Sequence, residues 1–361
     1  MADFFELDFL DVETKKSGDA IALRYSIVGK TFIHVVDGGF QVTGDKLVKH
    51  IRSHYGAPKV IDCVVLTHND GDHAGGLCQV FEEFEVKELW MLRPWDFAEE
   101  LLPRFARFSS VDGLQKRLKE AFPNIAALEE VAVKKKVTIF NPFQGASIGA
   151  FRVMSPSKAT YLDLVVESEK TPQKAPISQG KNSIASYFAE KAAAVIEFVR
   201  SLWGDESFPS DETSAENEMS VVQFAEIAGQ KILLTGDVGR RGLEEAADFA
   251  PSIGLALPGI DRFQVPHHGS RRNVSTEVLN RWLGTPLPQQ PKDGETKFTT
   301  IISAAKADED HPRKAVIRAM IHRGGRVITN QGQDIRTSKN APKREGWTAV
   351  APLPYPEEQE G

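Results

Sequence analysis

The chain has 361 residues, of which 41% are hydrophobic and 26% are charged, with a formal net charge of −6. This composition is typical of a soluble globular protein, and the acidic balance disfavours a passive nucleic-acid-binding module, because each neutralised phosphate requires a Lys or Arg. No apolar run approaches the roughly 18 to 20 residues that a membrane-spanning helix needs, and the acidic start is unlike a signal peptide. We therefore expect a cytoplasmic protein without a membrane role, in which Cys63 and Cys78 stay reduced.

The first part of the chain alternates between short strands and helices. The run Val-Ile-Asp-Cys-Val-Val-Leu-Thr at 60–67 is nearly continuous in apolar residues, as expected for a central strand covered on both faces. The other strands are rich in β-branched and aromatic residues. We predict strands at 5–12, 20–26, 31–37, 60–67, 89–92, 133–139 and 147–155, and helices at 46–55, 75–84 and, with interruptions, 101–128.

The composition of the sequence changes at about residue 167. Residues 167–182 are polar and are predicted to form a loop, residues 183–203 are rich in alanine with helical periodicity, and residues 204–217 are acidic and loop-like. We interpret 167–217 as an insertion in one fold and as a candidate surface for a protein partner. The remaining chain is predicted to continue one domain over 1–350, followed by a polar C-terminal tail at 351–361.

Regular alternation returns after the insertion. Strands are predicted at 219–227, 231–235, 262–266, 299–303 and 325–330, and helices at 240–249, 275–283 and 312–323. Strands followed by helices at both ends of the chain, with strand-rich segments between them, indicate an α/β protein with two mixed sheets faced by helices.

Four potential metal ligands lie within the six residues after the buried strand 60–67. The loop His68-Asn69-Asp70-Gly71-Asp72-His73 combines imidazole and carboxylate groups, which suit zinc, manganese or iron(II). Gly71 allows a backbone turn through which these side chains converge. The alternative is a polar turn that caps the next helix, but the density of ligands in this loop favours a metal site.

Two later strands also end in polar groups. Asp237 follows an apolar strand in the sequence Leu-Leu-Thr-Gly-Asp, and a carboxylate at such a position is suited to bridging two cations. His267 and His268 follow the strand 262–266. On an extended backbone they would point in different directions, so that one binds metal and the other faces the substrate.

The order and spacing of these motifs resemble the metallo-β-lactamase superfamily, and in particular the soluble hydrolase domain of ComEC-type DNA-uptake competence proteins. The resemblance rests on the segments at 9–12 and 18–21, 36–39, 68–73, 233–238, 265–270 and 303–312. It implies a four-layer αββα sandwich holding two divalent metal ions, zinc or manganese. Asp70 stands where the superfamily usually has a second histidine of the loop, which makes the ligand set more oxygen-rich.

The resemblance also suggests a role for each group. Asp72 would bind metal and accept a proton, the non-ligating member of His267 and His268 would act on the substrate, and Asp37 would support the loop. The superfamily's middle histidine is missing, because no histidine lies between His73 and His267. Asn217 and Ser220 stand where the competence group has an Asn-x-x-Ser pattern, and either is expected to support the site indirectly. The site would therefore hold one metal weakly or use water to complete its shell.

Residues after the second histidine suit a phosphate group. Arg271 and Arg272 can bind phosphate oxygens in a bidentate manner, although a solvated helix start is the alternative. We assign Ser270 and His311 to substrate binding as well, with a helix N-cap as the alternative for His311. The sequence therefore predicts a metal-dependent phosphodiesterase or nuclease acting on DNA, RNA or a smaller diester. The alternatives are an ester, thioester or lactam hydrolase, and a partner-binding effector subunit of a multi-protein system.

Overall fold

The computed structural model describes residues 2–171, 198–292 and 294–360. Within these ranges no helix is both long enough and apolar enough to cross a bilayer. The predicted loop at 167–182 and the predicted helix at 183–203 fall largely outside the described residues.

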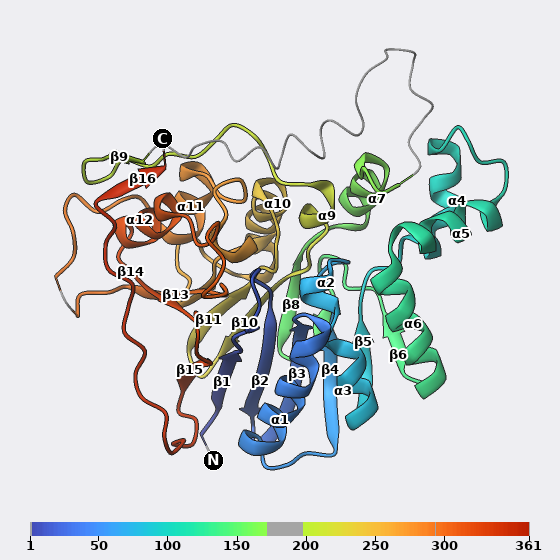
Figure 1. Ribbon diagram of the computed structural model, residues 1–361, viewed down its shortest axis with the longest axis horizontal. Coiled ribbons are helices and arrows are strands. Elements are labelled where there is room, and N and C mark those ends of the chain that lie inside the picture. Colours follow the sequence, from blue (N-terminus) through green and yellow to red (C-terminus); the bar gives the residue numbers. More distant parts are fainter. Residues whose placement is uncertain (1, 172–197, 293, 361) are drawn as a thin grey trace.

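Two seven-stranded sheets form the centre of the molecule (Figure 1). The first sheet has the order β15-β1-β2-β3-β4-β5-β6, with bounds Ile335–Lys339, Phe4–Phe9, Ala20–Ile27, Lys30–Gly38, Val60–Val65, Glu85–Trp90 and Thr138–Phe140. The second has the order β14-β13-β12-β11-β10-β8-β7, with bounds Gly325–Thr329, Phe298–Ile302, Arg262–Gln264, Gln230–Leu234, Val222–Ile227, Phe151–Ser155 and Ser147–Ile148.

Helices cover the outer faces of both sheets. Those of the first half are α1 (Gly44–His54), α2 (Gly71–Ala74), α3 (Leu77–Glu83), α4 (Ala98–Leu101), α5 (Val111–Ala121), α6 (Pro123–Lys135) and α7 (Lys158–Glu167). Those of the second half are α9 (Ala215–Glu218), α10 (Arg240–Phe249), α11 (Thr276–Leu283) and α12 (Lys314–His322). Short 3-10 turns lie at Gln41–Thr43, Pro94–Phe97, Leu102–Arg104, Ala250–Ile253 and His267–Gly269.

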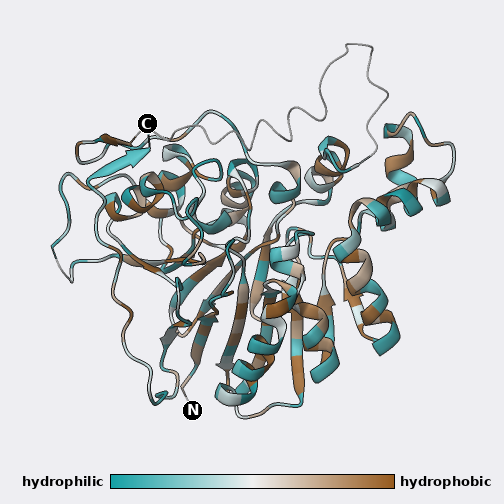
Figure 2. Ribbon diagram, in the orientation of Figure 1, coloured by the Kyte–Doolittle hydropathy of each residue, from teal (hydrophilic) through white to brown (hydrophobic). Residues whose placement is uncertain are grey.

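The alternation of side chains along β11 shows how the layers separate. Ile232 and Leu234 belong to the core that joins the two sheets, whereas Leu233 between them packs into the core under α10 and α11. This follows from the two-residue period of a strand, whose successive side chains point to opposite faces. Apolar residues accordingly concentrate on the strands in Figure 2. The predicted four-layer αββα sandwich is confirmed.

Parallel strands place the polar loops at one edge of the molecule. Strands β3, β4, β5 and β6 are mutually parallel, as are β11, β12, β13 and β14. The carboxyl ends of parallel strands meet at the same edge of a sheet, where ligands of α/β proteins usually bind. The end of β3 and the loops after β4, β11, β12 and β13 supply most residues of the candidate site.

Several local predictions were wrong. Residues 133–135 continue helix α6 and only Thr138–Phe140 is a strand, because α6 ends at Lys136 in a left-handed conformation. Strand β15 was missed, and residues 198–200 form strand β9 (Phe198–Arg200) instead of a helix. The predicted polar tail contains a strand, β16 (Glu358–Glu360), which pairs with β9 in a two-stranded sheet.

Candidate metal centre

Asp37, the next-to-last residue of β3, holds the loop after β4 in place through hydrogen bonds. Its carboxylate accepts hydrogen bonds from the backbone N–H of Thr67 at 2.8 Å and from the Thr67 hydroxyl at 2.6 Å. Its Oδ2 also lies 2.7 Å from Nδ1 of His73. Asp37 is buried and has a φ of 57°, a strained conformation for a residue other than glycine. The strain is consistent with a support whose carboxylate must face the metal loop.

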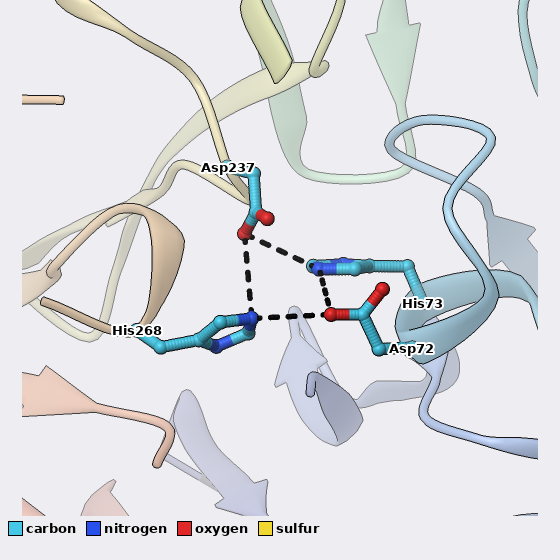
Figure 3. Close-up of side chains that lie close together, drawn as sticks. All are labelled: Asp72, His73, Asp237 and His268. Atoms are coloured by element: carbon cyan, nitrogen blue, oxygen red, sulfur yellow. Dashed lines mark ion pairs between the residues drawn. The ribbon is translucent and has the colours of Figure 1, made fainter. Parts of the chain in front are cut away.

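Four side chains converge on one point (Figure 3). Nε2 of His73 lies 3.2 Å from Oδ1 of Asp237. Nε2 of His268 lies 3.4 Å from Oδ2 of Asp72 and 3.9 Å from Oδ1 of Asp237. All four potential ligand atoms lie within 4.8 Å of one another. Such separations fit ligands placed roughly 2 Å from a shared cation.

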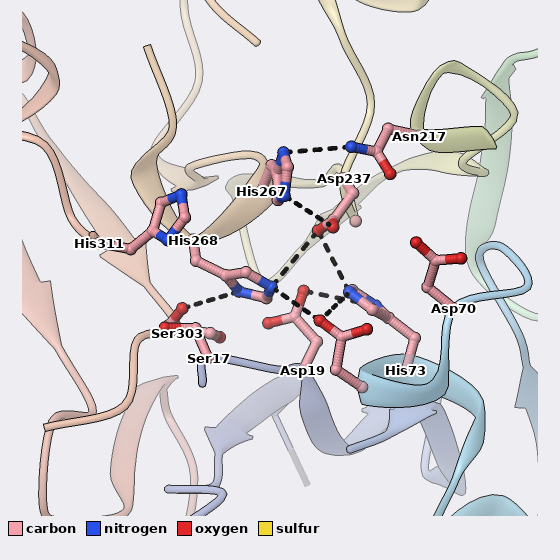
Figure 4. A network of polar contacts seen from close by, with 12 residues as sticks. Ser17, Asp19, Asp70, His73, Asn217, Asp237, His267, His268, Ser303 and His311 are labelled. Atoms are coloured by element: carbon pink, nitrogen blue, oxygen red, sulfur yellow. Dashed lines mark hydrogen bonds and ion pairs between the residues drawn. The ribbon is translucent and has the colours of Figure 1, made fainter. Parts of the chain in front are cut away.

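The second oxygen of Asp237 faces a different group (Figure 4). Its Oδ2 lies 3.8 Å from Nε2 of His68 and 3.7 Å from Nε2 of His267. Oδ2 of Asp70 lies 3.9 Å from the same nitrogen of His68. Asp237 therefore stands between two sets of donors, one toward each carboxylate oxygen.

The backbone at the paired histidines differs from the predicted extended form. His267 has a φ of 48° and His268 a φ of 55°, so both adopt the left-handed conformation. This turn directs both rings toward Asp237, one on each side. The extended backbone assumed from the sequence is therefore wrong here, since alternation of side chains belongs to strands, and both rings lie close to Asp237, at 3.7 Å for His267 and 3.9 Å for His268.

Each histidine is oriented by a partner at its outer nitrogen. Nδ1 of His268 can only donate to the backbone carbonyl of Ser303, at 2.9 Å, and Nδ1 of His73 donates to the carboxylate of Asp37. Because the Thr67 hydroxyl already donates to Asp37, it accepts from Nδ1 of His68, at 3.1 Å. These partners leave each Nε2 with a lone pair directed inward. Such outer partners commonly orient metal-binding histidines.

Nδ1 of His267 lies between two amides. Oδ1 of Asn273 is 3.0 Å away and Nδ2 of Asn217 is 3.2 Å away. Asn273 donates from its own Nδ2 to the carbonyls of Asp237 and Val238, which leaves its Oδ1 to accept from His267. Asn217 thus lies beside His267.

The residues present fit a metal ion. Nε2 of His68, His73 and His268 and Oδ1 of Asp237 are all buried without a hydrogen-bond partner. Buried polar atoms without partners are costly, and bound cations would explain these four: His73, His268 and Oδ1 of Asp237 surround one position, and His68 faces the other oxygen of Asp237. The site therefore has the donors for divalent metal binding.

Electrostatics at the site point the same way. Burial lowers the pKa of His268, but Asp237 and Asp72 outweigh burial and raise that pKa to about 9. For His73 the opposing carboxylates of Asp237 and Asp37 likewise outweigh burial and raise the pKa well above its usual value. Burial opposes ionisation of Asp237, yet the surrounding imidazoles hold its pKa well below the usual range. These shifts share one cause, the close approach of carboxylates and imidazoles at this point.

The residues predicted to bind substrate are spread around this centre. The ring of His311 lies 5.6 Å from that of His267, and its Nδ1 lies 3.3 Å from Oδ2 of Asp308. Ser270 turns back into its own loop, where its hydroxyl accepts from the N–H of Arg272 at 3.3 Å. Arg271 reaches the carbonyl of Glu360 in the C-terminal strand, at 3.2 Å.

Two residues beside the candidate metal centre, Asp19 and Lys170, were not predicted from the sequence. Asp19 is buried, accepts from Nε2 of Gln264 at 2.8 Å, and its Oδ2 lies 3.9 Å from Nδ1 of His73. Lys170 pairs with Asp70 at 2.7 Å. Asp19 stood in a quoted motif, but neither residue lies near a ligand in the sequence, so no local signal indicated a contact.

Comparison with known proteins agrees with this geometry. Residues 25–149 match the model of the Metallo-beta-lactamase superfamily, a stretch that includes Asp37 and the loop 68–73. Over this stretch the chain is similar to proteins of the metallo-β-lactamase superfamily. It is 30% identical over 125 residues to the ComE operon protein 3 of Bacillus subtilis (strain 168), a match that covers 34% of this chain and 14% of that protein. The chain therefore spans only a small part of this relative.

Solved structures give a more distant likeness. The hydrolase AbOPH of the beta lactamase superfamily is 12% identical, with 61% of this chain and 56% of that chain covered at a TM-score of 0.30. The metallo-beta-lactamase SMB-1 is 9% identical, with 70% and 78% covered at a TM-score of 0.29.

Proposed function

We propose that the protein is a metal-dependent phosphodiesterase, acting on DNA, RNA or a smaller phosphodiester. The observation that carries the proposal is the position of Asp237, whose two oxygens face two separate sets of donors. Bridged pairs of divalent cations are common in enzymes that cleave phosphate esters. The oxygen-rich ligand set, with Asp70 beside His68, favours manganese or zinc as the ions.

Bound divalent ions would lower the pKa of a water and stabilise negative charge on phosphorus. Side chains of the protein would accept a proton from the attacking water and donate one to the leaving oxygen. Asp72 turns Oδ2 toward His268 and its side chain is 26% exposed, so its carboxylate can accept a proton from a water that enters from solvent. Since His267 and His268 both face Asp237, protonation of the leaving oxygen is assigned to His311, which Asp308 holds at the rim.

The match to the ComE operon protein 3 supports a nucleic-acid substrate, although it covers a small part of that protein. We place the protein in the cytoplasm, in keeping with its two free cysteines, Cys63 and Cys78. We also propose that the insertion at 167–217 contacts a protein partner. Residues 172–197 of this insertion lie outside the described ranges.

A single set of assays tests the proposal. The protein is prepared with manganese, with zinc or without metal, and is given bis-p-nitrophenyl phosphate, plasmid DNA, RNA and the lactam nitrocefin. We expect metal-dependent diester cleavage that Asp72→Ala and His73→Ala lower by about 10²- to 10⁴-fold. Diester cleavage that ignores both substitutions would overturn the mechanism. Cleavage of nitrocefin alone would favour the lactam hydrolase, and a protein that binds no metal would favour the partner-binding subunit.

A further inference from the structure

Lys170 brings a cation to the metal loop from a distant part of the chain. Its ammonium lies 2.7 Å from Oδ1 of Asp70, although the two residues are 100 positions apart in the sequence. Lys170 follows helix α7 and precedes the stretch that the structure does not describe. It belongs to none of the superfamily motifs quoted above.

The backbone around Lys170 is held firmly. Its N–H donates to the hydroxyl of Ser168 at 3.2 Å, and that hydroxyl donates to the buried carboxylate of Glu216. The hydroxyl of Thr171 donates to the carbonyls of Val165 and Ser168, both at 2.8 Å. A side chain that extends from such an anchored turn reaches a defined place.

The two oxygens of Asp70 serve different partners. Oδ2 faces His68 on the side of the candidate metal position, whereas Oδ1 faces Lys170. The side chain of Lys170 is 41% exposed, and an ammonium has three donors, of which the bond to Asp70 needs one. Its cation can therefore stay near the metal loop and also bind a ligand that enters from solvent.

We infer that Lys170 is a substrate-binding residue that recognises an anionic oxygen of the substrate and competes with metal for the charge of Asp70. This inference rests on the proposed function, because it assigns the anion to a phosphodiester. A cation bound on the Oδ2 side would share the negative charge of Asp70 and weaken its attraction for Lys170. The ammonium is then available to a phosphate oxygen, with which it forms a strong charge-assisted hydrogen bond.

Removal of the charge should therefore have two effects of opposite sign. Lys170→Met should bind Mn²⁺ about two- to fivefold more tightly at the position that His68 and Asp70 face, since a neighbouring positive charge is gone. The same variant should bind inorganic phosphate, and the diester substrate, roughly tenfold more weakly. A residue needed only for folding would not produce this pair of opposite shifts.

The test compares four forms of the full chain after metal removal: the unaltered protein, Lys170→Met, Lys170→Arg and Lys158→Met. Lys158 is the matched control, because it lies on α7, pairs with Glu100 at 2.5 Å and is 46% exposed. Mn²⁺ binding is measured by titration with electron paramagnetic resonance, and the affected position is identified as the one that His68→Ala removes. Phosphate binding to the Mn²⁺-loaded protein is measured by calorimetry.

We expect Lys170→Arg and Lys158→Met to match the unaltered protein in both measurements, and Lys170→Met alone to show the opposite shifts. Unchanged affinities in Lys170→Met, or weaker Mn²⁺ binding, would overturn the inference. Kinetics add a second readout: the KM for bis-p-nitrophenyl phosphate should rise, while that for a neutral phosphotriester should not. A protein without diesterase activity would refute the proposed function, yet the Mn²⁺ and phosphate affinities would still decide the role of Lys170.

Discussion

Asp237 is the residue on which the proposed two-metal arrangement depends. It is buried, it lies at the end of an apolar strand, and each of its oxygens has its own set of facing imidazoles. His267 and His268 are neighbours in sequence, yet they serve opposite sides of this carboxylate. A single substitution at either histidine should therefore affect one metal position, whereas a substitution at Asp237 should affect both.

Metal content distinguishes these cases. Asp237→Ala should lose both ions after dialysis, and His267→Ala should lose one and keep the ion held by Asp72, His73 and His268. The measurement is metal per chain by mass spectrometry, with circular dichroism to show that each variant is folded. Asp248→Ala is the control, because Asp248 lies on α10 with 74% of its side chain exposed. Equal losses in the Asp237 and His267 variants would contradict the separate positions.

At the scale of elements, a buried ionic cluster joins α11, α12 and the segment before α9. The carboxylate of Glu206 accepts from the hydroxyl of Thr276 at 2.7 Å, and it pairs with Arg323 and with His322. Burial raises the pKa of Glu206, but the hydrogen bonds from His322 and Arg323 outweigh burial and lower it to about 2. The ionised cluster therefore stabilises the packing of helices that carry the loops on the second sheet.

This cluster gives the protein a defined acid sensitivity. Because the folded-state pKa lies below the unfolded value of roughly 4.3, the stabilisation is complete above the unfolded value and declines as pH falls toward about 2. Glu206→Gln should lower the free energy of unfolding by roughly 3 kcal/mol at pH 7, because Arg323 stays buried without its anion. That difference should shrink between about pH 4.3 and pH 2 in urea titrations. A difference that stays constant down to pH 2 would show that the charge is not the cause.

At the scale of the whole molecule, the C-terminal strand β16 joins β9 to the start of α12. Strand β16 pairs with β9, and the carboxylate of Glu360 accepts from the N–H groups of Lys314 and Ala315, both at 2.9 Å. These groups are otherwise unpaired donors at the start of α12, where a negative charge is favourable. Glu360 also accepts from Arg271 through its carbonyl, so the strand contacts the loop that carries His267 and His268.

Loss of this cap should be measurable in stability. Glu360→Ala should lower the free energy of unfolding by about 1 kcal/mol, the usual effect of losing a helix N-cap. Chemical denaturation of the two variants Glu360→Ala and Glu357→Ala gives the comparison, with Glu357 as an exposed residue of the same segment. Equal stability of both variants would show that Glu360 does not stabilise the start of α12.

The sequence by itself determined the class of fold and the metal loop. The apolar run before His68 required a buried strand, and four ligands in six residues left few other uses for that loop. Elements with strong periodicity, such as α10 at Arg240–Phe249, were predicted at their observed bounds. These signals are local, because each depends on residues that are close together in the sequence.

Only the tertiary structure decided which residues share the site. The roles of His267 and His268 depend on two left-handed residues, and no spacing in the sequence reveals that both rings turn toward Asp237. Lys170 and Asp19 meet the metal loop through chain segments far from it, and β16 forms only because β9 lies beside it. Contacts of this kind are set by the packing of two sheets, so the local pattern predicts the ligands but not their partners.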